Sequence, residues 1–281
     1  MTVEVMPDRL TAAETDQLRT AVHALEGGGF ASKLANLLGR QVEAVGRALP
    51  GPARALVARV TESALRTALR VAIRTIDSTA PPKASTRMHK ALAAASGAAG
   101  GAFGLGAVAV ELPVSTTIML RSIAQIAREE GEDLAQPEAA LACVEVFALG
   151  GRAAGDSAVD GGYFAVRTML ARTVGESARF LLQRGLADET APILVRLVAQ
   201  IAARFGLVVS QKLAAQAIPV LGAFGGAAVN LAFTEHFQTL ARGHFTVRRL
   251  ERAYGPHEVQ AEYGRIAREA GFWPRETAGA A

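Results

Sequence analysis

The residues whose spacing best suits chemistry form the pattern D-x-x-x-D-x-x-Y-x-x-x-R, from Asp156 through Asp160 and Tyr163 to Arg167. Separations of three and four residues place these side chains on neighbouring faces of one helix. Carboxylates that converge with a phenol and a guanidinium could line a polar pocket and act there as general acids or bases. The same face could instead orient the helix through hydrogen bonds in the core, and we favour this structural interpretation.

Two further charges, Glu111 and Arg121, bracket a segment that is otherwise uncharged. A buried charge must be paired or hydrated, so each needs a partner if the segment is buried. If the protein is an enzyme, the first residues to mutate are Glu111, Arg121, Asp156, Asp160 and Tyr163. That hypothesis predicts that these five side chains meet in space. The sequence shows no Ser–His–Asp or Cys–His arrangement, so the interpretation leans towards a protein that is not an enzyme.

Metal and nucleotide sites have little support. His236 and His244 are eight residues apart, whereas zinc-binding histidines on one helix are four apart. The glycine-rich run 97–106 follows no strand pattern and precedes no G-K-[ST] motif. The single cysteine, Cys143, lies in the apolar run LACVEVFAL, which predicts a buried thiol. We therefore predict no metal and no cofactor, and a reducing compartment.

A basic stripe runs along the helix predicted at about 52–77. Arg59, Arg66, Arg70 and Arg74 fall within an arc of roughly 80° at about 100° per residue. We call these four residues the Arg ridge. The plain interpretation is a core helix with a solvated edge; the alternative is a ridge that binds anionic lipid headgroups. Nucleic acid is disfavoured, because no aromatic side chains are interleaved with these arginines.

The elements that would position these residues are all helical. Half of the residues are apolar but only 5% are aromatic, so the core must consist mainly of Ala, Leu, Val and Ile. Ala and Leu are the best helix formers, and runs typical of strands are missing. We predict an all-α fold, a multi-helix bundle around a Gly/Ala-rich buried helical hairpin. The helices are predicted at about 11–25, 30–49, 52–77, 114–130, 137–149, 156–173, 174–186 and 191–205, followed by a basic, amphipathic tail of helices over about 235–270.

Two uncharged stretches, 91–110 and 213–234, are long enough to cross a bilayer. Five glycines weaken the first stretch, and Gln216, Pro219 and Asn230 weaken the second. We therefore favour burial of both stretches in the core of a soluble protein. Insertion of the stretches into a membrane is the alternative.

The chain shows no repeat, no long linker and no apolar signal segment at its start. We expect N-terminal helices with the basic ridge over 1–80 and a helical domain over 81–270, joined in one continuous domain 1–270. The tail 271–281 is expected to fray. The formal net charge is +4, and residues 1–90 hold 13 Lys and Arg against 8 Asp and Glu. This surplus suits an anionic partner.

The sequence resembles the EcsC family over roughly residues 85–260, whereas the first 80 residues match less clearly. The stretches that carry the resemblance are ELPVSTTIMLRSIAQIAREEGEDL (111–134), PEAALACVEVFALGG (137–151), GGYFAVR (161–167), LVRLVAQIAARFGLVVSQKLAAQAIPVLGAFGGAAVNLAFTEHFQ (194–238) and ARGHFTVRRLERAYG (241–255). The family is named for a protein encoded beside the subunits of an ABC transporter. The resemblance implies a bacterial, membrane-associated role and brings no established catalytic residues.

Three hypotheses follow. The first is a non-enzymatic accessory or scaffold protein, cytoplasmic and peripheral to the inner membrane, whose partners are an anionic membrane surface or a membrane transporter and not nucleic acid. The second is a hydrolase with a polar pocket. The third is a lipid- or hydrophobe-binding helical bundle that uses gaps between small side chains as a cavity.

Overall fold

The computed structural model describes residues 9–38, 51–76, 108–151, 162–184, 191–216 and 222–274. Within these ranges every regular element is an α-helix, so the predicted all-α fold is confirmed. The helices are α1 (Ala12–Glu26), α2 (Phe30–Leu38), α4 (Gly51–Ile76), α6 (Val108–Glu129), α7 (Pro137–Leu149), α8 (Tyr163–Arg184), α9 (Pro192–Gln216), α10 (Gly222–Tyr254) and α11 (Pro256–Glu269). Of the predicted Gly/Ala hairpin, residues 91–107 and 217–221 fall outside the described residues.

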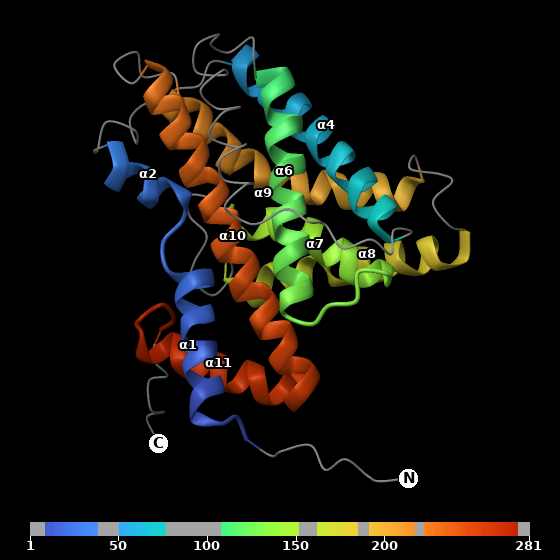
Figure 1. Ribbon diagram of the computed structural model, residues 1–281, viewed down its shortest axis with the longest axis vertical. Helices are drawn as coiled ribbons and strands as arrows, with labels where there is room; N and C mark the ends of the chain where they lie inside the picture. Colours follow the sequence, from blue (N-terminus) through green and yellow to red (C-terminus); the bar gives the residue numbers. More distant parts are fainter. Residues whose placement is uncertain are drawn as a thin grey trace, which may run out of the picture.

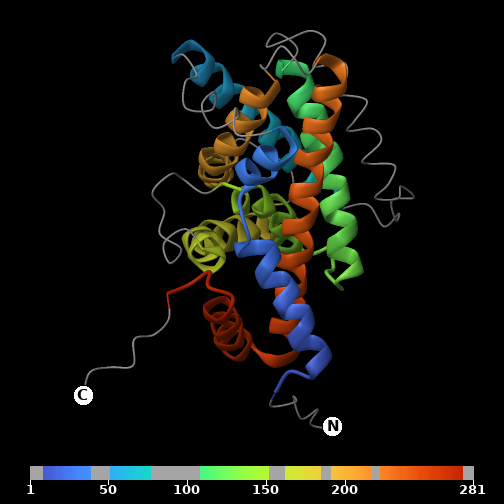
Figure 2. The same ribbon diagram turned by 90° about the vertical axis from the view of Figure 1, so that its left-hand side faces the viewer.

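The longest helix, α10, runs through the length of the molecule (Figure 1). It packs against α1 and α11 towards one end and against α6 and α9 towards the other. Helix α4 packs on α6, α7 and α9 at that second end. The turned view in Figure 2 shows α6 and α10 extending side by side along the long axis. The N-terminal helices thus pack on helices from the C-terminal half of the chain.

Helix α7 lies inside the bundle. It packs against α4, α6, α8, α9 and α10, and between Pro137 and Ala148 only Glu138 is exposed. Its sequence, PEAALACVEVFAL, places apolar residues on every side of the helix, as is typical of a buried helix. Pro137 begins the helix, where a missing backbone N–H costs no hydrogen bond.

Local sequence signals mark the start of α1 and the turn between α10 and α11. The T-x-x-E pattern forms a capping box at α1: Glu14 N–H donates to Thr11 Oγ1 at 3.3 Å, and Thr11 N–H donates to Glu14 Oε2 at 3.0 Å. Between α10 and α11 the chain turns at Gly255, which has a φ of 88°. This left-handed conformation is open to glycine without steric cost.

Three predicted helix boundaries are wrong. Helix α6 starts at Val108 and contains Pro113, because one missing backbone donor does not stop a helix that packs well on both sides. Helix α8 is one helix through Gly175, where two had been predicted, and α9 continues through Gly206 to Gln216. An interior glycine costs only about 1 kcal/mol relative to alanine, and burial of the flanking apolar residues exceeds that cost.

Neither of the two uncharged stretches is described by the structure along its whole length. Residues 91–107 lie outside the described residues. The stretch 213–234 is divided between the end of α9 and the start of α10, with 217–221 outside the description. Of the predicted tail, Phe272 and Trp273 pack against the hydrophobic core.

Gly151 lets the end of α7 approach α9 closely. A Cβ atom on Gly151 would lie 2.2 Å from the backbone oxygen of Arg204. We expect Gly151→Ala to lower the free energy of unfolding by about 1–3 kcal/mol, because the backbones must move apart. Chemical denaturation measures this. The control is Gly175→Ala, since a Cβ there meets open space and should stabilise α8 by about 0.5–1 kcal/mol. An equal loss of unfolding free energy in the two variants would show that the close approach at Gly151 is not the cause.

Candidate functional site

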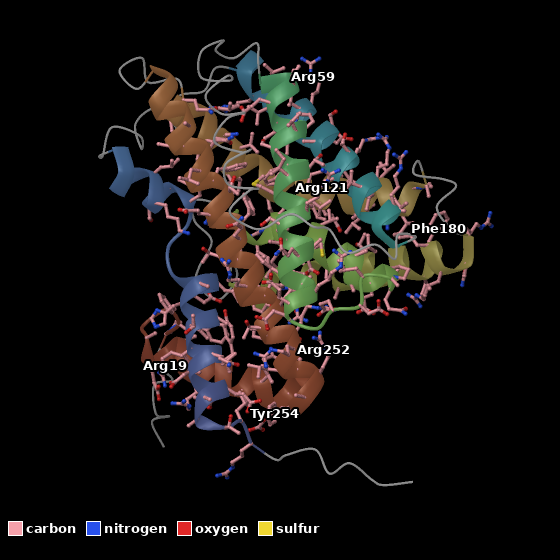
Figure 3. The ribbon with its side chains drawn as sticks, viewed as in Figure 1. Arg19, Arg59, Arg121, Phe180, Arg252 and Tyr254 are labelled. Carbon is pink, nitrogen blue, oxygen red and sulfur yellow. The ribbon has the colours of Figure 1, made fainter. Side chains whose placement is uncertain are left out.

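The Arg ridge occupies the solvent side of α4. The opposite face of the helix is buried, with Ala64, Leu65 and Ala68 fully inaccessible. Because this face packs on α6, α7 and α9, the arginines are turned outwards. Arg59 lies at the end of the molecule where α4 begins and points away from the core (Figure 3).

The four ridge residues differ in their surroundings. Arg59, Arg66 and Arg74 are exposed and Arg70 is half-buried. Arg66 Nη2 lies 2.5 Å from Glu62 Oε1, four residues earlier on the helix, an exposed pair that contributes little stability. Within the described part of the chain, Arg59 and Arg74 have no acidic partner. These two cations are about 22 Å apart at 1.5 Å per residue.

Glu111 is buried and forms an ion pair with a lysine that the sequence analysis did not single out. Lys212 of α9 is 1% exposed, and its Nζ donates to Glu111 Oε1 at 2.6 Å. The same Nζ lies 4.7 Å from the centroid of the Phe233 ring. Burial lowers the pKa of Lys212, and the carboxylate of Glu111 opposes that shift. A lone lysine in an otherwise apolar helical stretch was the sequence signal for this pair.

Arg121 does not join Glu111. It is exposed on α6, and Figure 3 labels its place along that helix. Ten residues of helix separate the two positions by about 15 Å. Arg121 has no acidic partner among the residues that the structure describes.

Tyr163 begins α8 and is buried among polar groups. Its backbone N–H donates to Glu26 Oε1 at 3.1 Å, and its hydroxyl lies 3.0 Å from His244 Nδ1. Arg167 Nη1 donates to the Tyr163 hydroxyl at 3.3 Å, so these two members of the sequence pattern do share one helix face. Asp156 and Asp160 lie outside the described residues.

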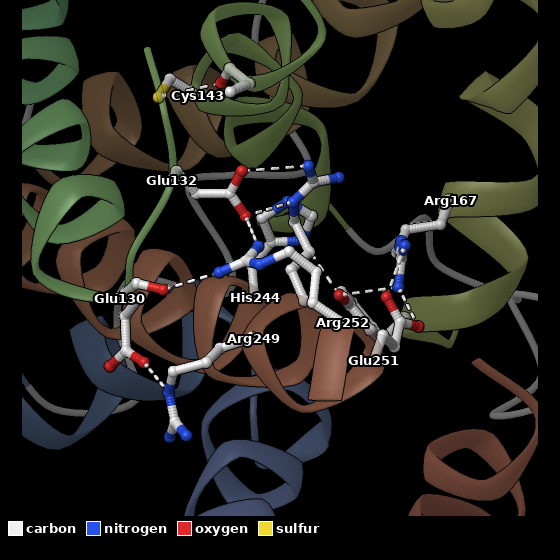
Figure 4. A network of polar contacts seen from close by, with 11 residues as sticks. Glu130, Glu132, Cys143, Arg167, His244, Arg249, Glu251 and Arg252 are labelled. Carbon is white, nitrogen blue, oxygen red and sulfur yellow. Dashed lines mark hydrogen bonds and ion pairs between the residues drawn. The ribbon is translucent and has the colours of Figure 1, made fainter. Parts of the chain in front are cut away.

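Ion pairs join Arg167 of α8 to α10, and join α10 to the segment after α6 (Figure 4). Arg167 donates both terminal nitrogens to Glu251, at 2.8 and 3.0 Å. Arg248 makes a similar double contact with Glu132, at 2.8 and 3.2 Å. The remaining pairs are Arg252 with Glu132 and Arg249 with Glu130. We call these side chains, together with Tyr163 and His244, the polar network.

A buried carboxyl, Glu145 of α7, faces the polar network. Burial raises the pKa of Glu145 to about 7; Arg167 and Arg248 oppose this shift, and Glu251 adds to it. The pKa of His244 lies well below its usual value, because burial and the same two arginines disfavour its charged form. His244 is therefore a neutral imidazole at physiological pH.

The polar network joins α8, α10 and the segment after α6. Tyr163 and His244 are fully enclosed, and the arginines donate to fixed carboxylates. Cys143 is also inert: burial raises the pKa of its thiol to about 12, and Sγ donates to the Ala139 carbonyl at 3.5 Å. Among the described residues, no group of three or more His, Cys, Asp or Glu side chains could hold a metal ion.

The enzyme hypothesis required its candidate residues to meet, and the described ones do not. Glu111 pairs with Lys212, Arg121 faces solvent, and Tyr163 belongs to the polar network. Sequence spacing could not reveal the network, because its partners are distant in the chain: Arg167 and Glu251 are 84 residues apart.

One helix of the described residues, α9, is long and apolar enough to cross a bilayer by length and composition, and 39% of its most apolar window is buried. Core helices of soluble proteins meet the same criterion, so α9 alone does not indicate a membrane span.

The family model described as the EcsC protein family matches residues 2–250. This match covers most of the chain and includes the N-terminal helices that resembled the family less clearly. The chain belongs to the EcsC family. No curated protein and no solved structure matches it. The EcsC match ends within α10, and it includes the Arg ridge, the Glu111–Lys212 pair and most of the polar network.

Proposed function

We propose that this EcsC protein is a non-enzymatic accessory or scaffold protein that binds the cytoplasmic face of the membrane through the Arg ridge. The observation that carries the proposal is the exposure of Arg59 and Arg74 on the outer side of α4, with no acidic partner in the described residues. Guanidinium groups bind phosphate oxygens in a planar, bidentate geometry. An ABC transporter in the same membrane is the protein partner that the family name suggests.

The buried charges support this proposal indirectly. Glu111 and the carboxylates of the polar network are occupied by internal cations. Their role is therefore structural, whereas Arg59 and Arg74 are exposed and have no acidic partner among the described residues. A basic residue near an anionic membrane contributes about 1 kcal/mol to binding.

Sedimentation with vesicles tests the proposal. The wild-type protein should bind vesicles that contain phosphatidylserine or phosphatidylglycerol and not pure phosphatidylcholine vesicles. Binding should weaken as salt rises, because exposed charges are screened. The double variant Arg59→Glu/Arg74→Glu should bind at least about thirtyfold more weakly, since two favourable contacts of about 1 kcal/mol each are lost.

The matched control is Arg9→Glu/Arg242→Glu. These arginines are also exposed, and neither lies on α4, so the control carries the same change in net charge. It should retain most of the binding. Equal losses in the two variants would mean that net charge alone drives binding. Binding that depends on neither lipid charge nor salt concentration would overturn the electrostatic proposal.

A further inference from the structure

The first two turns of α6 present an exposed apolar surface. Val110 is 72% exposed and Val114 is 47% exposed. A separation of four residues places them on the same face of the helix. The one charged residue of this segment, Glu111, points inwards to Lys212. The outward side of these turns therefore carries no charge.

Two other exposed apolar residues, both on α8, lack this setting. Met169 and Leu182 on α8 are exposed, but the surface between them carries the Arg172–Glu176 ion pair. On α6, by contrast, the outward stripe is apolar for two turns and reaches a charge only at Arg121. At 1.5 Å per residue, Arg121 lies about 16 Å beyond Val110.

We infer that Val110 and Val114 form an apolar anchor that inserts into the lipid bilayer beside the bound Arg ridge. This inference deepens the proposed function and rests on it. Helices α4 and α6 begin at the same end of the molecule (Figures 1 and 2), and Arg59 lies at that end (Figure 3). A membrane that meets the outer side of α4 at this end contacts the two valines and Arg59 together.

The charges around the anchor identify lipid as its occupant. Arg59 and Arg121 are exposed cations without acidic partners in the described residues, so the surface that covers the valines must be apolar within and anionic at its rim. An anionic bilayer has both properties. A second copy of this chain, docked through the same face, would bring like charges together, which disfavours association. Arg121 is long enough to hold its charge at headgroup level while its stem lies on apolar surface.

Site-specific fluorescence tests the anchor. The variant Val110→Cys is labelled with the environment-sensitive dye NBD, and native Cys143 does not compete because it is buried. On vesicles containing phosphatidylserine, the NBD emission should shift to shorter wavelength and rise severalfold, and spin-labelled lipids should quench it. The control is NBD on Thr168→Cys, an exposed position of α8, where the emission should not change.

A second variant tests the apolar anchor without a dye. Because both valines are exposed, Val110→Ser/Val114→Ser should melt at the wild-type temperature. It should bind anionic vesicles about tenfold more weakly, through loss of apolar burial. Sedimentation at wild-type affinity with unchanged NBD emission at position 110 would overturn the anchor and leave the Arg ridge proposal standing. If neither the labelled protein nor the wild-type protein sediments with anionic vesicles, the apolar anchor and the Arg ridge proposal are both wrong.

Discussion

Replacing Lys212 by methionine should lower the free energy of unfolding by about 3–5 kcal/mol. The carboxylate of Glu111, which now lies 2.6 Å from Lys212 Nζ, would remain buried without its cation. The Phe233 ring, which faces the ammonium group at 4.7 Å, gives a carboxylate no compensation. Urea denaturation at neutral pH, followed by circular dichroism, measures the change.

The control for this prediction removes both charges. Glu111→Met/Lys212→Met keeps similar side-chain volume and leaves no buried ion. Because apolar pairs often replace buried ion pairs without loss, the double variant should recover wild-type stability or exceed it by about 1–4 kcal/mol. A double variant as unstable as Lys212→Met would show that packing shape, rather than the unpaired charge, controls this site.

Replacing Glu145 by glutamine should change how stability depends on pH. Burial raises the pKa of Glu145 from 4.5 to about 7, so between these values the folded protein binds a proton that the unfolded chain has released. That stabilising proton is fully held below about pH 4.5 and is lost as pH rises through 7. The wild type should therefore lose about 3 kcal/mol relative to Glu145→Gln between pH 4.5 and pH 8.

The comparison between the two proteins is essential, because other groups titrate in the same range. Burial lowers the pKa of His236 to about 3 and also lowers that of His244. These histidines destabilise the fold as pH falls below about 6.5, which is the opposite trend. Both proteins contain them, so their effect cancels in the difference. A difference that stays constant from pH 4.5 to pH 8 would show that Glu145 is not held in its neutral form.

The parts of the fold that the sequence predicts well are those with local causes. The capping box at Thr11, the first-turn proline at Pro137 and the bounds of α4 depend on residues within a few positions of each helix end. The face of α4 that carries the Arg ridge also follows from helical periodicity alone. Such features can be predicted from the sequence without knowing what packs against them.

The rest depends on tertiary packing. Nothing near Gly175 or Gly206 shows that the helix continues, because the stabilising burial comes from α7 and other distant elements. The partner of Glu111 lies 101 residues away in the sequence. The polar network joins Glu132 to Arg248 across 116 residues. Since no spacing rule connects such positions, the sequence could indicate that buried charges needed partners but could not identify them.

The central claim is that charge holds this protein on the membrane surface. Fractionation of native host cells, followed by high-salt and carbonate washes of the membranes, tests it most directly. We predict that the protein is found with the membranes, that high salt releases most of it, and that carbonate releases all of it. Resistance to both washes would show insertion across the bilayer, and a wholly soluble protein would show that the Arg ridge does not bind a membrane; either result would contradict the account.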